Sequence, residues 1–415
     1  MKHKNFFFGF VIALAAISVT FSGCKDDDPE DPTLVALVAG TIDLNAATSA
    51  TEVPVNPTIV ATFNVEIDPS SATSANITLT QDYDNTDIPL TITASGRNIT
   101  IVPVDDLGTG TLYELKFKSG LKSVDGLTLS EVTRTFSTIG AFAPSGAIAH
   151  WTFENNANDV AGSFNPAANG IVDITYVDSR NTAAGKAASF NGTTSIIEIP
   201  NGDQLINTNN FTISFWVRAE PQDKGHFVIG LGAFWGLQFE IFGGLDGAKF
   251  AVRYELADGT TIGEDMWFPS NADYADNGGW QGWDFAKAIT PENYVAMVSN
   301  KWLHVTFTYN AATKAGILYY NGEKMKSQNF NLWPADAPHR NVVGLKYAGT
   351  MPDVNNDLAF GFIQSRAGSL WANEPWGGYD FPGANHFKGQ LDDIRIYHKV
   401  LSPTEILLMY DSEKP

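Results

Sequence analysis

Short runs in which hydrophobic and polar residues alternate recur along most of the chain. Between positions 34 and 140 they include TIVATF, NITLT, NITIVPV, YELKFK and RTFST, separated by Asn-Pro, Asp-Pro, Ser-Gly and Asp-Gly turns. A strand that presents one face to a core and the other to solvent repeats every two residues, so this pattern indicates strands rather than helices. Residues 34–140 are therefore predicted to form a small antiparallel sandwich.

A second set of strand signals fills residues 147–415. FTISFWVRA places Phe211, Ile213, Phe215 and Val217 on one face of a strand, and Asn321-Gly322 fits the turn of a type I′ hairpin. Near the end, Ser402, Pro403 and Glu405 have the spacing of a capping box, which predicts a short helix. Residues 141–146 (AFAPSG) are small and turn-prone, and all ten tryptophans follow them, so this segment is predicted to be a linker.

The first 33 residues do not fit a folded domain. MKHKN and the 16-residue apolar run FFFGFVIALAAISVTF have the order of a signal peptide, and the run is short for a membrane span. Phe21-Ser22-Gly23-Cys24 resembles a bacterial lipobox, which implies a signal peptide at 1–23 and a lipid on Cys24, the only cysteine. Residues 24–33 form an acidic linker that resembles the surface-export signal of Bacteroidetes lipoproteins. We therefore expect a lipid-anchored protein of the outer membrane, exposed on the cell surface.

Two family resemblances follow from the order of these segments. VPVNPTIVATFNVEIDP and NITIVPVDDLGTGTLYELKFKSGLKSVDG, closed by RTFST, resemble bacterial Ig-like domains. ASFNGTTSIIEIP, FTISFWVRA, KWLHVTFTYN, GILYYNGEK and GQLDDIRIYHKVLSPTEI resemble a laminin-G-like domain of the concanavalin A-like lectin/glucanase superfamily. The resemblances imply an all-β protein, with an Ig-like sandwich followed by a concanavalin A-like jelly-roll sandwich. That fold serves lectins, glycanases, lyases and adhesion modules, so it does not fix the function.

The net charge and the spacing of the carboxylates argue against two classes of function, nucleic-acid binding and catalysis. The net charge of −20 argues against nucleic acid as a partner, because phosphate binding needs clustered Lys and Arg. The E-x-D-x-x-E pattern of concanavalin-like glycanases is missing from the second domain. Asp392 and Asp393 are adjacent, so on a regular strand they would face opposite sides. We therefore do not expect an enzyme.

The concanavalin A-like resemblance also implies one structural calcium ion. Asp393 occupies the matching position, and Glu154 with Asp159 would supply further oxygen ligands. The alternative is that Asp393 pairs with Arg395 or Arg253.

The remaining sequence feature that bears on function is the placement of the tryptophans. Six tryptophans lie in two long insertions, about 263–300 and 329–386, where no strand period is visible. Either these rings bury one another as a satellite core, or they form a platform for sugar rings, and the two readings are compatible. The predicted ligand-binding residues are Trp267, Trp280, Trp283, Trp333, Arg366, Trp371, Asn373, Glu374, Trp376 and Tyr379.

An anchor, an Ig-like stalk and a distal domain with aromatic loops resemble the surface glycan-binding lipoproteins of Bacteroidetes polysaccharide-utilisation systems. The resemblance implies non-catalytic binding of an extracellular polysaccharide, with the membrane contacted only through the lipid and with outer-membrane glycan-transport proteins as partners. A protein-binding or adhesion module is one alternative, and a glycoside hydrolase or polysaccharide lyase is another.

Overall fold

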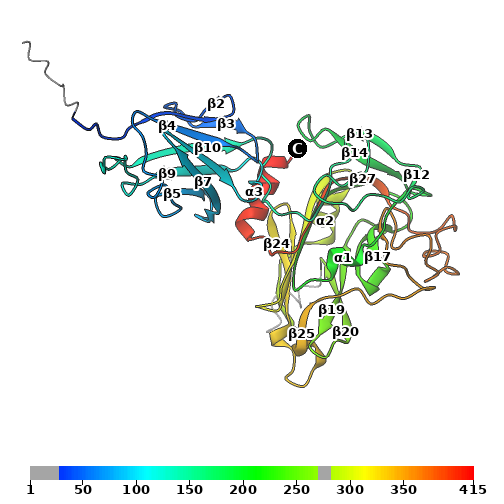
Figure 1. The fold of residues 1–415 in the computed structure, drawn as a ribbon. Coiled ribbons are helices and arrows are strands. Elements are labelled where there is room, and N and C mark those ends of the chain that lie inside the picture. Colours follow the sequence, from blue (N-terminus) through cyan, green and yellow to red (C-terminus); the bar gives the residue numbers. More distant parts are fainter. Residues whose placement is uncertain (1–27, 270–281) are drawn as a thin grey trace, which may run out of the picture.

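The computed structural model describes residues 28–269 and 282–415, and it is almost entirely β (Figure 1). Cys24 and Trp280 lie outside these ranges, so the predictions for them stay predictions. Within the described ranges, no helix has the length and apolar character needed to cross a membrane.

The first domain is a sandwich of two five-stranded sheets. One sheet has the order β2–β1–β4–β8–β7 and contains β1 Leu34–Ala39, β2 Ile42–Asp43, β4 Ile59–Phe63, β7 Leu90–Ser95 and β8 Asn98–Pro103. The other has the order β3–β10–β9–β5–β6 and contains β3 Ala50–Val53, β5 Ile77–Gln81, β6 Asp87–Ile88, β9 Leu112–Phe117 and β10 Val132–Thr138. In β4 the alternate residues Ile59, Ala61 and Phe63 are buried, as the period of two requires.

The second domain packs a nine-stranded sheet on an eight-stranded sheet. The nine-stranded sheet has the order β13–β14–β27–β16–β22–β23–β24–β21, with β11 also paired to β27. Its strands are β11 Ala149–Trp151, β13 Thr175–Asp178, β14 Lys186–Asn191, β16 Asn210–Ala219, β21 Trp283–Ala286, β22 Trp302–Asn310, β23 Ala315–Tyr320, β24 Glu323–Asn329 and β27 Lys388–Tyr397.

The eight-stranded sheet has the order β12–β15–β26–β17–β18–β19–β20, with β25 also paired to β19. Its strands are β12 Ile171–Val172, β15 Ile196–Ile199, β17 His226–Leu231, β18 Leu237–Ile241, β19 Ala248–Leu256, β20 Thr261–Phe268, β25 Val342–Leu345 and β26 Leu358–Phe360. Short helices connect the strands: α1 Asp203–Ile206, α2 Pro291–Val298, η1 Ala233–Trp235, η4 Phe330–Leu332 and η5 Pro338–Asn341.

The local predictions for the second domain are confirmed. Phe211, Ile213, Phe215 and Val217 all belong to the core between the sheets. The β23–β24 hairpin turns at Asn321 and Gly322, both with positive φ, as a type I′ turn requires. The all-β class and the two successive sandwiches are likewise as predicted.

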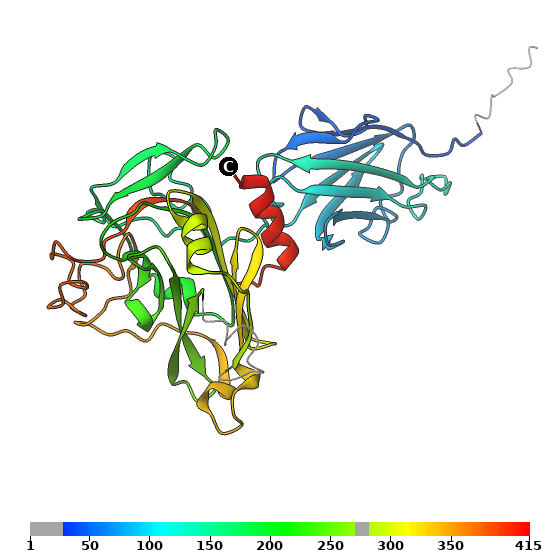
Figure 2. The same cartoon turned by 180° about the vertical axis from the view of Figure 1, so that it is seen from behind.

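The C-terminal helix α3, Pro403–Glu413, lies between the two domains and contacts both (Figures 1 and 2). It begins with the predicted capping box, in which Ser402 and Glu405 exchange side-chain hydrogen bonds with each other's backbone. Tyr83 of the first domain donates a hydrogen bond to Glu405 at 3.2 Å. The backbone N–H of Phe142 donates to Ser412 at 3.1 Å, and the Phe142 ring packs in a cluster with Met409.

Candidate functional site

The outward face of the eight-stranded sheet carries two rows of directly opposed side chains. One row crosses β17 to β20 and consists of Phe227, Glu240, Lys249 and Trp267. The other starts at β15 and consists of Glu198, Ala359, Gly230, Gln238, Ala251 and Asp265. Their neighbours Phe239 and Phe250 point into the core, so both rows face away from it.

A long segment between β26 and β27, residues 361–387, lies over this face at β15, β26 and β17, and we call it the covering loop. Its Phe362, Ile363 and Ala384 form a small separate core with outward residues of the sheet, Phe227 and Ala359. The contact needs small residues beneath it: a Cβ on Gly230 would lie 1.9 Å from the carbonyl oxygen of Ile363. Part of this insertion therefore forms a satellite core, which is one of the two predictions made for it.

A continuous series of rings follows the edge of the covering loop. Centroid distances are 5.2 Å from Trp235 to Phe234, 6.0 Å from Phe234 to Trp371, 5.0 Å from Trp371 to Trp376 and 6.4 Å from Trp376 to Phe227. We call these five residues the ring series. Trp376 is 41% exposed, and Trp371 is partly exposed. The series therefore presents aromatic surface to solvent while its other members hold it against the sheet.

The backbone of the loop is shaped to present Trp371. This residue has φ of +60°, which a non-glycine residue adopts at an energetic cost. Gly377 makes room for it, because a Cβ there would lie 2.7 Å from the Cβ of Trp371. Hydrogen bonds from the N–H of Glu374 to the carbonyl of Trp371, and from Gly377 to Glu374, close the turn. The position of this ring is thus imposed by the surrounding loop.

The predicted polar partners divide into two groups. Arg366 pairs with Glu198 at 2.6 Å and donates to the carbonyl of Asn169, so it fastens the covering loop to β15. Tyr379 also has a supporting position, since its hydroxyl donates to the carbonyl of Thr194 and its ring packs on Phe362. Of the four, Asn373 and Glu374 are exposed and lie between Trp371 and Trp376 in sequence.

The other predicted tryptophans are scattered. Trp267 is 49% exposed on β20 and packs against Phe242 at 5.2 Å, at the far end of its row. Trp283 lies in the main core, with the Lys326 ammonium 4.1 Å from its ring, which removes it from the predicted binding surface. Trp333 stacks on His339 at 3.6 Å and packs against the same core. It too stands apart from the ring series.

The charged residues beside Trp267 were missed by the sequence analysis. Lys249 lies 3.4 Å from Glu240 and 3.6 Å from Asp265, and the Gln238 amide donates to Glu240 at 2.7 Å. Burial raises the pKa of Glu240, against the opposing effect of Lys249. Pairing of β18, β19 and β20, which no local pattern reveals, brings these charged residues together. Phe234 and Trp235 lie in η1 and join the ring series through the contact between Phe234 and Trp371, which the sequence likewise does not reveal.

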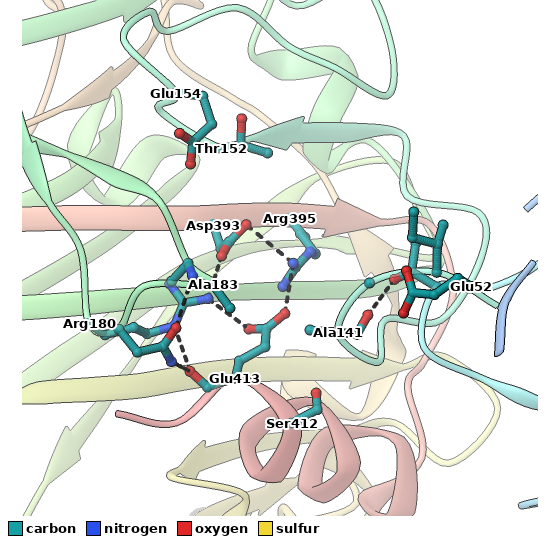
Figure 3. Close-up of a pocket in the computed structure, with 15 residues that line it drawn as sticks. Glu52, Ala141, Thr152, Glu154, Arg180, Ala183, Asp393, Arg395, Ser412 and Glu413 are labelled. Carbon is teal, nitrogen blue, oxygen red and sulfur yellow. Dashed lines mark hydrogen bonds and ion pairs between the residues drawn. The ribbon is translucent and has the colours of Figure 1, made fainter. Parts of the chain in front are cut away.

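The predicted calcium ligands lie elsewhere. Glu154 and Asp393 line a pocket of about 620 Å³ between the domains (Figure 3). Asp393 is bonded to Arg180 at 2.5 Å, to His150 at 2.9 Å and to Arg395 at 3.2 Å. Although burial opposes ionisation, Arg395 and His150 hold the pKa of Asp393 well below its usual range. Asp393 therefore pairs with Arg395, which is the predicted alternative to a calcium site.

These residues do not fit a calcium centre. Asp159 accepts hydrogen bonds from four backbone N–H groups, those of residues 150, 161 and 162 at Oδ1 and that of residue 164 at Oδ2, so most of its capacity as an oxygen ligand is already used. In the described part of the chain, no group of three or more His, Cys, Asp or Glu side chains has the geometry to hold a metal ion. The pocket also has no aromatic residue among its described lining.

The expectation that Asp392 and Asp393 face opposite sides is wrong. β27 shifts register against β16 at this point, and Asp393 has φ of +44°. Such a bulge turns one side chain onto its neighbour's face. Both carboxylates consequently contact Arg180, each at 2.5 Å. Arg180 also contacts Glu413 at the end of α3, so the two carboxylates belong to an ion-pair network that reaches this helix.

Two protein families match the chain by sequence. Residues 41–138 match the bacterial Ig-like domain, and residues 191–358 match the concanavalin A-like lectin/glucanases superfamily. The chain is thus a bacterial Ig-like domain followed by a concanavalin A-like domain. Both rows on the outward face of the eight-stranded sheet lie in the concanavalin A-like domain, and the covering loop follows the matched region. No curated protein sequence matches the chain.

Solved structures resemble part of the chain at low similarity. The receptor-binding domain of botulinum neurotoxin type G is 16% identical with a TM-score of 0.38, and covers 64% of this chain and 51% of its own. The binding domain of Paraclostridial Mosquitocidal Protein 1 is 19% identical with a TM-score of 0.40, over 64% and 52%. Domain 4 of an extracellular arabinanase from Geobacillus stearothermophilus, solved with arabinotriose, is 20% identical with a TM-score of 0.36, over 64% and 98%. The chain spans about half the length of the toxin domains, and similarity at this level carries no information about its ligand.

Proposed function

We propose that the protein binds an extracellular polysaccharide without cleaving it, by stacking sugar rings on Trp371 and Trp376. The observation that carries this proposal is the ring series, in which two adjacent tryptophans are presented to solvent by a loop that is itself packed on the sheet. A sugar has an apolar C–H face and a polar rim, so it needs flat rings with hydrogen-bonding groups beside them. Asn373 and Glu374, which lie between the two tryptophans in sequence, are exposed and can supply such groups.

The packing of the loop favours binding energetically. Ordering a mobile side chain on binding costs about 0.5–1.5 kcal/mol. Trp371 is already held by Phe234 and by the turn around Gly377, so this cost is met during folding. Stacking on planar bases contributes roughly 1–3 kcal/mol per ring, and a sugar stack belongs at the low end. Two stacked sugars with a few hydrogen bonds then give an affinity on the order of micromolar to millimolar.

The rest of the chain fits a role at the cell surface. A lipid on Cys24 would anchor the protein to the outer membrane, with the acidic segment 24–33 and the Ig-like domain as spacer and stalk. The binding domain would then stand clear of the membrane and could deliver glycan to transport proteins of a utilisation system. The support for this part is the sequence of the first 33 residues and the order of the two domains.

The test is retention of a soluble form, residues 25–415, on a panel of immobilised polysaccharides, with released reducing ends measured in the same wells. The Trp371→Ala, Trp376→Ala double variant should lose retention. Phe381→Ala is the matched control, because Phe381 is 39% exposed in the same loop but lies outside the ring series.

Retention by the parent and the control but not by the double variant, without sugar release, supports capture. Released sugar would instead identify an enzyme. Retention of the double variant at the parent's level would refute the role of these rings, and failure of the parent on the whole panel would favour a protein partner.

A further inference from the structure

We propose that the binding surface continues from the ring series across β18, β19 and β20 to Trp267, and that its ligand is an internal segment of a neutral, extended polysaccharide. This inference rests on the proposed function and adds the extent of the site and the class of its ligand. It concerns residues that the ring series does not include: Glu240, Lys249, Asp265, Trp267 and Phe242.

The geometry of the sheet places rings at both ends of one row. Phe227, Glu240, Lys249 and Trp267 stand directly opposite one another on four successive strands. Since neighbouring strands are 4.7–4.9 Å apart, the row is about 14 Å long. Trp376 of the ring series packs against Phe227 at one end, and Phe242 packs against Trp267 at the other. A ligand that contacts both ends must be longer than one sugar ring.

The middle of the row has the chemistry of a hydroxyl-binding floor. The side chains of Glu240 and Lys249 are each 16% exposed and that of Asp265 is 41% exposed, so all three reach solvent. A carboxylate accepts and an ammonium donates several hydrogen bonds, and the ion pairs among them leave some of that capacity for sugar hydroxyls. Glu240 and Asp265 would repel a carboxylated or sulfated sugar, whereas Lys249 would repel a cationic one. The arrangement favours a neutral ligand.

The same ion pairs argue against cleavage at this place. A glycosidase needs two carboxylates separated by the scissile bond, or by that bond and a water molecule. Here one ammonium lies within 3.6 Å of both carboxylates and therefore stands between them. Glu240 and Asp265 are placed to hold a chain rather than to break it.

The experiment measures affinity against ligand length. The probes are size-graded oligomers made by partial acid hydrolysis of the polysaccharide that the soluble form retains, and binding is measured by calorimetry. For the parent protein, affinity should rise with length until the oligomer spans the row. Trp267→Ala should abolish that rise, lowering affinity about five- to tenfold for long oligomers and leaving the shortest ones unchanged. Trp376→Ala should weaken binding at every length.

Two further variants test the role of the ring at position 267 and the role of Lys249. Trp267→Phe keeps a ring and should keep the rise with length, whereas Lys249→Gln should weaken only the long oligomers. Trp267 is exposed on an edge strand, so its replacement should leave the melting temperature nearly unchanged.

The inference is overturned if Trp267→Ala binds every length as the parent does, or weakens short and long oligomers equally. It is also overturned if the retained polysaccharide is anionic. Loss of binding in Trp267→Ala with full binding in Trp376→Ala would instead refute the proposed role of the ring series, so the two failures are distinguishable.

Discussion

One buried histidine should make the concanavalin A-like domain sensitive to acid. His304 lies on the outward face of β22, where α3 covers it, and is 1% exposed. Its ring lies 4.9 Å from that of Trp216 and 6.3 Å from that of Tyr410, and its Nε2 is 2.7 Å from the Ser214 hydroxyl. Burial, with Arg395 and Arg180 nearby, lowers the pKa of His304 to about 3.

The sign of the effect follows from proton binding. Between pH 6.5 and pH 3 the unfolded chain protonates this histidine and the folded chain does not. The unfolded state then binds more protons, so the free energy of unfolding falls as pH falls through this window and is unaffected above it. Each pH unit below 6.5 is worth about 1.4 kcal/mol, which gives roughly 2 kcal/mol at pH 5. A domain's whole stability is about 5–15 kcal/mol.

The assay compares the parent with His304→Gln in urea unfolding of residues 25–415, followed by tryptophan fluorescence at several pH values. Glutamine can still bond to Ser214 but does not titrate, so other ionisable groups cancel in the difference. At pH 7.5 the variant should be less stable because ring contacts are lost, and the difference should shift in its favour by about 2 kcal/mol by pH 5. His398→Gln, at an exposed position, serves as the control. A difference that stays constant from pH 7.5 to pH 5 would refute the reasoning.

Three further predictions concern the contacts that hold the candidate face and the domain junction. Arg180→Met should lower the free energy of unfolding by about 3–5 kcal/mol, because the buried Asp392 loses its cationic partner and Asp393 and Glu413 each lose one of theirs; a loss below 1 kcal/mol in urea unfolding would contradict this. Gly230→Ala should cost about 1–3 kcal/mol and weaken polysaccharide retention, since its Cβ displaces the covering loop; unchanged retention would show that loop placement does not matter. Phe142→Ala should speed proteolysis of residues 141–146 without changing glycan affinity, measured by gel and calorimetry.

Much of the fold could be predicted because its signals are local. The alternation in FTISFWVRA fixes which side of β16 faces the core, and Asn321-Gly322 fixes a hairpin through φ values that few residue pairs adopt. Ser402 and Glu405 likewise mark the start of α3 within four residues of chain. In each case the residues that determine the local structure are neighbours in sequence, so the sequence pattern alone is enough to predict it.

The candidate site could be predicted only in part, because its causes are not local. The composition of the covering loop identified Trp371 and Trp376, but nothing near Trp283 shows that a strand carries it into the core. Glu240 has no carboxylate at glycanase spacing along its own strand, yet strand pairing places it on the same face as Asp265 with Lys249 between them. The face of Asp393 depended on a bulge, which shifts the side-chain period by one residue.

The two predictions for the aromatic insertion, a satellite core and a sugar platform, are compatible because one concerns the buried side of the covering loop and the other its exposed side. Small residues at positions 230 and 359 let the covering loop lie directly on the sheet, and Phe362 and Ile363 fill the contact. That contact gives the loop a fixed shape, and the fixed shape holds Trp371 at a positive φ with its ring against Trp376. A loop without its own core would have to order these rings on each binding event. The buried half of the insertion is therefore what makes the exposed half suitable for binding, and substitutions in either half should act on the same affinity.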